Sequence, residues 1–221
     1  MKTDADSWLV HCRDGGLLPE RTFRILCEKL KEVLVEESNL KSVSAPVTIV
    51  GKINGQFNDL IKLLEEVGEV PARKFVFLGN YCSQGWQCIE CLQFLFCLKL
   101  KYPEHVTLLR GRNDTKMHTS LPSVLYISIQ KKYGNLNVWK YCCEVFNFLP
   151  LAALVEGRIF CVSGGLTPHL PQLDQINLLE RMRETPNSEG TMMDLLYSDP
   201  AENDGWGFKR MEGWYFGQNI S

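Results

Sequence analysis

Four short glycine-containing segments carry polar side chains whose types and clustering could do chemistry. The segments are Gly51-Lys52-Ile53-Asn54-Gly55, Gly79-Asn80-Tyr81-Cys82-Ser83-Gln84-Gly85, Arg110-Gly111-Arg112-Asn113-Asp114 and Ser163-Gly164-Gly165-Leu166-Thr167-Pro168. They offer amides, hydroxyls and cations, but Asp114 is their single carboxylate. Neutral amides bind divalent cations far less well than carboxylates do, so the segments on their own do not predict a strong metal site.

The segments sit within a predicted alternation of strands and helices. Short apolar runs predict strands over residues 47–50, 75–78 and 106–109, each running into one of the first three segments. Three- and four-residue apolar spacing predicts helices over 21–39, 57–67, 88–100 and 138–148, and a hairpin over 152–162 leads to Ser163. Loops are predicted over 42–45, 185–190 and 199–207. The succession predicts an α/β fold whose ligand-binding loops follow the carboxyl ends of the strands.

The composition is that of an ordinary globular chain. The 221 residues are 45% hydrophobic and 23% charged with a net charge of -2, which predicts one domain over 1–221 and favours neither nucleic acid nor an anionic membrane as partner. The amino terminus lacks the apolar run of a signal peptide, and the apolar stretch at 89–98 is too short to span a bilayer. We therefore expect a cytoplasmic or nuclear protein.

Nine cysteines lie mainly in apolar stretches. Cys88 and Cys91 form a C-x-x-C pair, which is typical of some zinc and redox sites, but neither a second pair nor a histidine at ligand spacing accompanies it. We interpret the cysteines as buried, reduced thiols that pack as small hydrophobic side chains.

In order and spacing, the four segments resemble the metal-binding loops GDxHG, GDxxDRG, GNHE and HGG of the phosphoprotein phosphatase family of serine/threonine phosphatases. Stretches between them are similar to the type-2A catalytic subunit group: Gly55-Gln56-Phe57-Asn58-Asp59-Leu60, Lys132-Tyr133-Gly134-Asn135, Leu149-Pro150-Leu151 and Asp194-Leu195-Leu196-Tyr197-Ser198-Asp199-Pro200. The resemblance covers nearly the whole chain. It implies a metallophosphatase-like, calcineurin-like β-sandwich with flanking helices, truncated before the family's last strands.

The resemblance also implies a pair of metal ions, but nearly every position that holds them carries another residue. The degenerate metal-ligand positions are Lys52, Asn54, Asn80, Arg112 and Ser163, the degenerate acid positions are Asn113 and Ser83, and Gln84 replaces an arginine. We therefore expect no catalytic residue and no cofactor. The alternative is an active phosphatase that holds an Mn, Fe or Zn pair through unorthodox ligands such as Asn54, Asn80 and Asp114.

The substitutions at these positions add about four positive units, the charge of two divalent cations. The resemblance therefore suggests a pocket that still attracts phosphate, with Arg110, Arg112, Lys52 and Arg210 as candidate phosphate-binding residues. The alternative is that Lys52 and Arg112 are ordinary solvated loop charges.

These expectations describe a pseudophosphatase, a serine/threonine phosphatase-like protein without metal-dependent hydrolysis. Its expected partners are phosphatase scaffold or regulatory subunits, or a phosphoprotein. A nonfunctional product of a duplicated or truncated gene would have the same sequence features.

Overall fold

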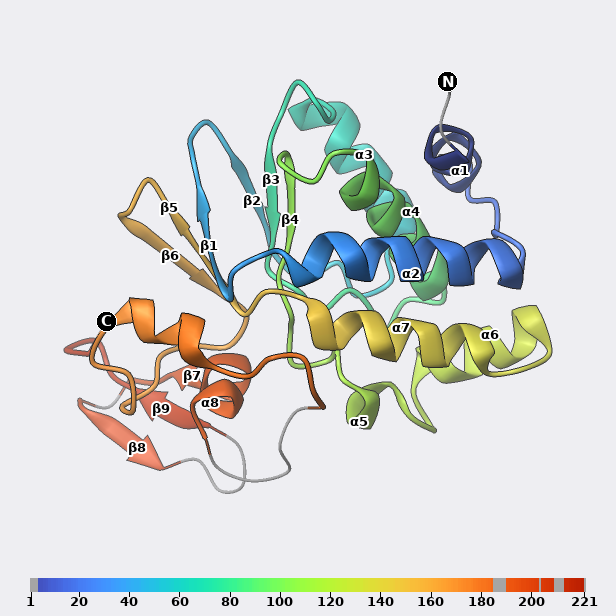
Figure 1. The fold of residues 1–221 in the computed structure, drawn as a ribbon. Helices are drawn as coiled ribbons and strands as arrows, with labels where there is room; N and C mark the ends of the chain where they lie inside the picture. Colours follow the sequence, from blue (N-terminus) through green and yellow to red (C-terminus); the bar gives the residue numbers. More distant parts are fainter. Residues whose placement is uncertain (1–3, 185–189, 203, 209–212, 221) are drawn as a thin grey trace.

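Two three-stranded sheets form the centre of the molecule. The computed structural model describes residues 4–184, 190–202, 204–208 and 213–220 (Figure 1). One sheet is fully parallel and contains β2 (Thr48–Val50), β3 (Phe75–Phe77) and β4 (Val106–Leu108), in that order. In the other, β5 (Ala152–Val155) lies between β1 (Leu40–Val43), to which it is parallel, and β6 (Ile159–Val162), to which it is antiparallel.

The alternation of side chains along β3 explains how the two sheets pack. Successive residues of a strand point to opposite faces. Phe75 and Phe77 join the large core beneath the helices, whereas Val76 joins a small core with Val155 and Cys161 of the other sheet. The sheets therefore form a sandwich with a helical layer outside it, as the sequence predicts.

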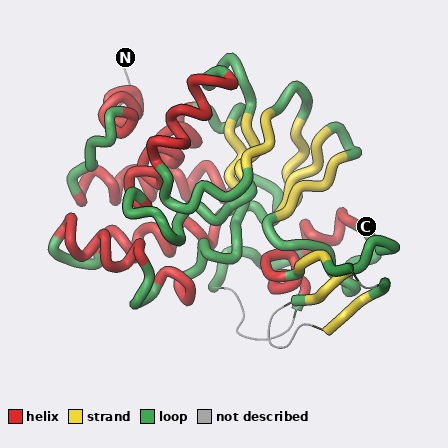
Figure 2. The backbone as a smooth tube through the Cα atoms, turned by 180° about the vertical axis from the view of Figure 1, so that it is seen from behind, coloured by secondary structure: helices red, strands yellow, loops and turns green. Residues whose placement is uncertain are grey.

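Most of the helices gather on one side of the paired sheets (Figure 2). This layer contains α1 (Asp4–Arg13), α2 (Glu20–Val35), α3 (Phe57–Val67), α4 (Cys88–Lys101), α5 (Lys116–Thr119), α6 (Val124–Tyr133) and α7 (Asn137–Phe148). Nearly all of α4 is buried, because α1, α2, α3 and α6 pack around it. Its continuous apolar sequence suits that central place.

The other sheet is covered by the carboxyl-terminal part of the chain. A 3-10 helix, η1 (Leu173–Leu178), and α8 (Thr191–Tyr197) supply Ile176, Met192 and Leu196 to a core that also contains Leu40 and Ala152. A third sheet follows, in the order β7 (Asp199–Pro200), β9 (Trp214–Phe216) and β8 (Trp206–Phe208).

Several sequence-based predictions need correction. The first long helix ends at Val35, four residues before the predicted end. The loop predicted over 42–45 begins inside β1, and the loop predicted over 199–207 contains β7 and the start of β8. These short strands gain their hydrogen bonds from distant partners and so leave little local signal. Most of the loop predicted over 185–190 lies outside the described residues.

All nine cysteines are buried with free thiols, as expected. Burial raises the pKa of the Cys82 and Cys142 thiols well above the ordinary value, so they remain protonated and act as packing groups. Among the described residues, no helix is both long and apolar enough to cross a membrane.

Candidate functional site

The four segments meet at one edge of the sandwich, where β2, β3, β4 and β6 end. Backbone hydrogen bonds join the first two segments: Asn54 N–H donates to Asn80 O (3.1 Å), and Gly85 N–H donates to Asn54 O (2.7 Å). The third segment joins them through Asn113 N–H, which donates to Asn80 Oδ1 (2.9 Å). The fourth joins them through Ser163 Oγ, which accepts from Asn80 Nδ2 (3.2 Å), and its next residue, Gly164, donates its N–H to Leu195 O of α8 (3.0 Å). The structure thus brings the predicted segments together.

Glycine is required where the second and third segments touch. A Cβ atom at Gly79 would lie 2.4 Å from the backbone nitrogen of Gly111, and a Cβ atom at Gly111 would lie 2.3 Å from the backbone nitrogen of Asn80. Both distances are well below van der Waals contact. The two loops can approach this closely only because neither residue has a side chain.

Asn54 and Asn80 stand at positions whose backbone is left-handed, with φ of 55° and 57°. Asparagine tolerates this conformation better than most residues. Their amides face neighbouring segments: Ser83 Oγ donates to Asn54 Oδ1 (2.8 Å), and Asn80 Nδ2 donates to Ser163 Oγ (3.2 Å). Four of the degenerate positions therefore bond to one another in pairs.

This donor set does not fit a pair of divalent metal ions. Both polar atoms of the Asn80 side chain are engaged, the oxygen by Asn113 N–H and the nitrogen by Ser163. Within the described ranges, no group of three or more histidine, cysteine, aspartate or glutamate side chains could hold a metal. Lys52 and Arg112, which are cations, would repel one.

The only carboxylate of the segments, Asp114, serves the backbone. It is fully buried, and its oxygens accept hydrogen bonds from the N–H groups of Asn80 (2.7 Å), Gly111 (2.8 Å) and Tyr81 (3.1 Å). Burial raises the pKa of Asp114 to about 6, and the three backbone hydrogen bonds oppose that shift. Asp114 thus fixes the second and third segments to each other.

Arg110 lies on the inner side of the third segment and is fully buried. Its guanidinium donates to Arg183 O (2.9 Å), Asn147 Oδ1 (2.9 Å) and Arg181 O (3.4 Å), and burial lowers its pKa to about 10. The expected phosphate contact of Arg110 is at odds with this burial, because its donors already face protein oxygens and solvent cannot reach them. Arg110 is a packing residue in this structure.

The other candidate cations differ in their surroundings. Lys52 is exposed on the first segment. Arg112 is half-buried, with its guanidinium carbon 5.0 Å from the centre of the Tyr197 ring, a cation–π arrangement. Arg210 lies outside the described residues. Lys52 and Arg112 therefore remain as candidates for an anion site.

Sequence reasoning missed three aromatic residues beside the segments. Tyr197 carries Arg112 on its ring, and its hydroxyl lies 3.1 Å from Nδ1 of His118. Trp86 follows the second segment directly, and its side chain is 65% exposed in a pocket beside Lys52. The position of Trp86 directly after the last glycine of the second segment is a local sequence signal that could have identified it. Tyr197 and His118 contact residues that are distant in sequence, so no local pattern indicates that they lie beside the segments.

Comparisons with known proteins agree with this geometry. Residues 45–220 match the family model described as calcineurin-like phosphoesterase. The serine/threonine-protein phosphatase ppe1 of Schizosaccharomyces pombe is 42% identical over 219 residues, which are 99% of this chain and 71% of that protein. A solved Saccharomyces cerevisiae serine/threonine phosphatase with similarity to human phosphatase PP5 superposes with a TM-score of 0.86 at 24% identity, covering 94% of this chain and 67% of that one.

The structural likeness shows the calcineurin-like metallophosphoesterase fold, and the sequence match shows the family. The four segments, their meeting point and the two-sheet sandwich thus have one explanation: this chain belongs to the phosphoprotein phosphatase family of serine/threonine phosphatases, in its type-2A-related group.

Proposed function

We propose that this chain is a pseudophosphatase, a family member that binds partners and does not hydrolyse phosphate esters through metal ions. The observation that carries the proposal is the set of hydrogen bonds at the degenerate ligand positions, where Asn80 bonds to Ser163 and Asn113, and Asn54 bonds to Ser83. These amides and hydroxyls are neutral and already bond to one another, so they provide neither the negative charge nor the free oxygens that hold a divalent cation.

The segments also lack the two groups that metal-dependent hydrolysis needs, an acid for the leaving group and a metal-bound hydroxide. Asn113 stands where the family resemblance implies the acid that protonates the leaving group, and an amide has no pKa in the range that such catalysis needs. Lys52 and Arg112 supply positive charge but cannot generate a metal-bound hydroxide. Uncatalysed phosphate-monoester hydrolysis is among the slowest biological reactions, so charge alone would give no useful turnover.

Binding of a phosphoprotein is the part of the proposal that the two remaining cations support. Lys52 is exposed and makes no hydrogen bond or ion pair within the described part of the chain. Arg112 is held on the Tyr197 ring, which reduces the freedom that it would lose on binding a phosphoryl group. Lys52 offers a point charge to a phosphoryl group, and Arg112 offers a planar donor.

Phosphatase scaffold or regulatory subunits are the second class of partner that we propose, bound through surface helices and not through the cleft. Membership of the type-2A-related group supports this choice. Affinity capture from cytoplasmic and nuclear extract, using the full chain as bait, tests it. Failure to enrich any such subunit over a bead control would remove this class.

Metal content and turnover, measured on the same preparation, test the central proposal. We expect less than one metal ion per chain by mass spectrometry after incubation with Mn²⁺ and dialysis, and no release of phosphate from a phosphoserine peptide. The Schizosaccharomyces pombe phosphatase, prepared identically, is the positive control. Two retained Mn, Fe or Zn ions together with turnover that Asn80→Ala abolishes would establish the alternative, an active enzyme with an atypical metal site.

A further inference from the structure

A pocket of about 470 Å³ lies between the first and second segments. One wall comes from residues 51–54 and the other from Gln84, Gly85 and Trp86, with the start of α3 forming its base. The volume is within the range of roughly 300–1,000 Å³ that is usual for ligand sites. Asn54 and Gly85 line the pocket, so it lies directly against the hydrogen bond that joins the first two segments.

Trp86 is the most distinctive group of the pocket. An indole that is 65% exposed leaves a large apolar surface in water, and tryptophan is among the residues that most often anchor a binding partner. The position of Trp86 outside every core cluster means that the fold gains little from the ring itself. Its exposed face is therefore free to pack against a ligand.

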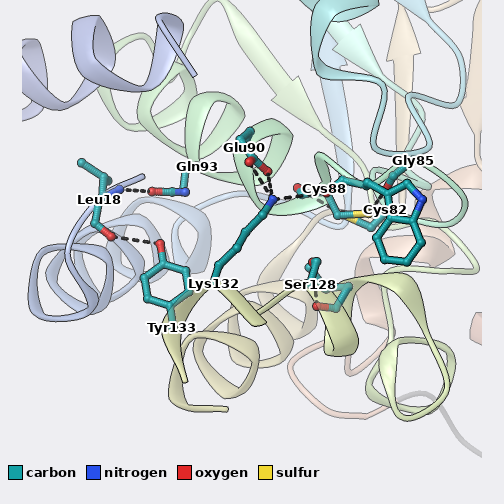
Figure 3. Close-up of polar contacts among 11 residues, drawn as sticks. Leu18, Cys82, Gly85, Cys88, Glu90, Gln93, Ser128, Lys132 and Tyr133 are labelled. Carbon is teal, nitrogen blue, oxygen red and sulfur yellow. Dashed lines mark hydrogen bonds and ion pairs between the residues drawn. The ribbon is translucent and has the colours of Figure 1, made fainter. Parts of the chain in front are cut away.

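The wall that carries Trp86 is fixed from behind. Lys132 of α6 donates to the backbone oxygen of Trp86 (3.2 Å). It also donates to both carboxylate oxygens of Glu90 (2.6 and 2.8 Å), a buried residue of α4 (Figure 3). From the front, Gly85 N–H donates to Asn54 O (2.7 Å). A wall held on both sides loses little conformational entropy when it binds a ligand.

The charges and the floor of the pocket limit what it can hold. Lys52 and Asp59 line it with opposite signs, so the pocket has no net charge. Val50 and Leu60 contribute apolar surface to its floor. An uncharged, large and preferably aromatic side chain matches this lining, whereas an acidic side chain would lie near Asp59.

We infer that this pocket binds a large apolar side chain of a phosphorylated peptide, close in sequence to a phosphoserine or phosphothreonine that Lys52 holds on the first segment. The inference rests on the proposed binding of a phosphoprotein. Lys52 belongs to both the pocket and the first segment, so an extended peptide, which advances about 3.3 Å per residue, reaches both places within a few residues. The pocket then selects among phosphorylated sequences.

Fluorescence anisotropy with labelled peptides tests this inference. The probes are a phosphoserine peptide whose other side chains are uncharged, with phenylalanine at successive positions beside the phosphoserine, and the same peptides with alanine or glutamate there. We expect phenylalanine at one or two positions to tighten binding about tenfold over alanine, and glutamate to give no gain. Trp86→Ala should abolish that difference and leave the affinity of the alanine peptide unchanged.

Two variants separate recognition from folding. Trp86→Phe should retain most of the preference for phenylalanine, because it keeps an aromatic ring on the same fixed wall. Phe208→Ala removes another exposed aromatic side chain, 62% exposed on β8, and should change nothing. If the phenylalanine and alanine peptides bind equally, or if Trp86→Ala and Phe208→Ala lose the preference for phenylalanine equally, the pocket inference is wrong. The proposed binding of a phosphoprotein is then unaffected. Absence of binding by every phosphorylated peptide, at millimolar concentration, would overturn phosphoprotein binding as well.

Discussion

The inner and outer sides of the third segment differ in what their charges do. On the inner side, Arg110 and Asp114 are fully buried and bond to backbone groups and Asn147. On the outer side, two residues away, Arg112 is half-buried against the ring of Tyr197. Buried charges that bond to the backbone are costly to change, whereas a partly exposed charge is cheap to change. A cationic residue in such a loop therefore indicates ligand binding only when the structure shows that its side chain lies on the outer side of the loop.

Among these predictions, we expect loss of the Asp114 carboxylate, on the inner side, to lower the free energy of unfolding the most. Asp114→Ala leaves three buried N–H groups without acceptors, and we expect the free energy of unfolding to fall by about 3–5 kcal/mol. Urea denaturation followed by circular dichroism measures it. Asp174→Ala, an exposed aspartate, is the matched control and should stay within about 0.5 kcal/mol of the parent. Similar losses of unfolding free energy in both variants would contradict a structural role for the buried carboxylate of the inner side.

The two arginines compare the sides directly. Arg110→Ala removes a buried side chain and leaves Arg183 O and Arg181 O without its donors, so we expect a loss of about 2–4 kcal/mol. Arg112→Ala removes a half-buried side chain and its cation–π contact with Tyr197, and should cost less than Arg110→Ala, about 1 kcal/mol. Thermal and urea unfolding of both variants measure which substitution destabilises the protein more. A larger loss of unfolding free energy in Arg112→Ala would contradict the assignment of Arg110 as the packing residue and Arg112 as the candidate anion-binding residue.

The dependence of stability on pH should report the buried Asp114 carboxyl. Its pKa is raised from 3.8 to about 6, so between these values the folded chain keeps a proton that the unfolded chain has lost. The free energy of unfolding should therefore fall by about 2–3 kcal/mol as pH rises from 4 to 6, and this contribution should then level off.

Asp114→Asn is the control for that measurement, because it cannot titrate there. The difference between parent and variant in urea midpoint, taken from pH 4 to 7.5, isolates the contribution of Asp114. If the difference instead grows in favour of the parent as pH rises, the three backbone hydrogen bonds outweigh burial in setting this pKa.

Much of the fold was predictable because its signals are local. The helix predicted over 57–67 is α3 residue for residue, since its apolar spacing is regular and Gly68 follows it. The strand and helix after it are also found within a residue or two of their predicted ends. By contrast, β1 depends on β5, which lies more than a hundred residues further along the chain, and its own sequence Leu40-Lys41-Ser42-Val43 gives a weak strand signal.

The same division applies to the candidate site. The collinear glycine segments predicted that four loops meet, and the hydrogen bonds of the Asn54 backbone and the Asn80 side chain confirm it. The burial of Arg110 could not be predicted, because its partners Arg181 and Arg183 follow it by 71 and 73 residues. The fixed position of Trp86 likewise depends on Lys132, 46 residues away on another helix. Sequence patterns locate the loops, and tertiary packing decides which side of a loop each charge faces.

The contact between Gly79 and Gly111 has a consequence for how such a chain is inherited. A side chain at either position would force the loops after β3 and β4 apart, whereas Asn80 and Arg112, directly beside that contact, both carry side chains. A lineage can therefore exchange metal ligands one at a time while the loops keep their shape. In such a lineage the glycine framework outlasts the chemistry, and it is a more durable mark of descent than the ligands are.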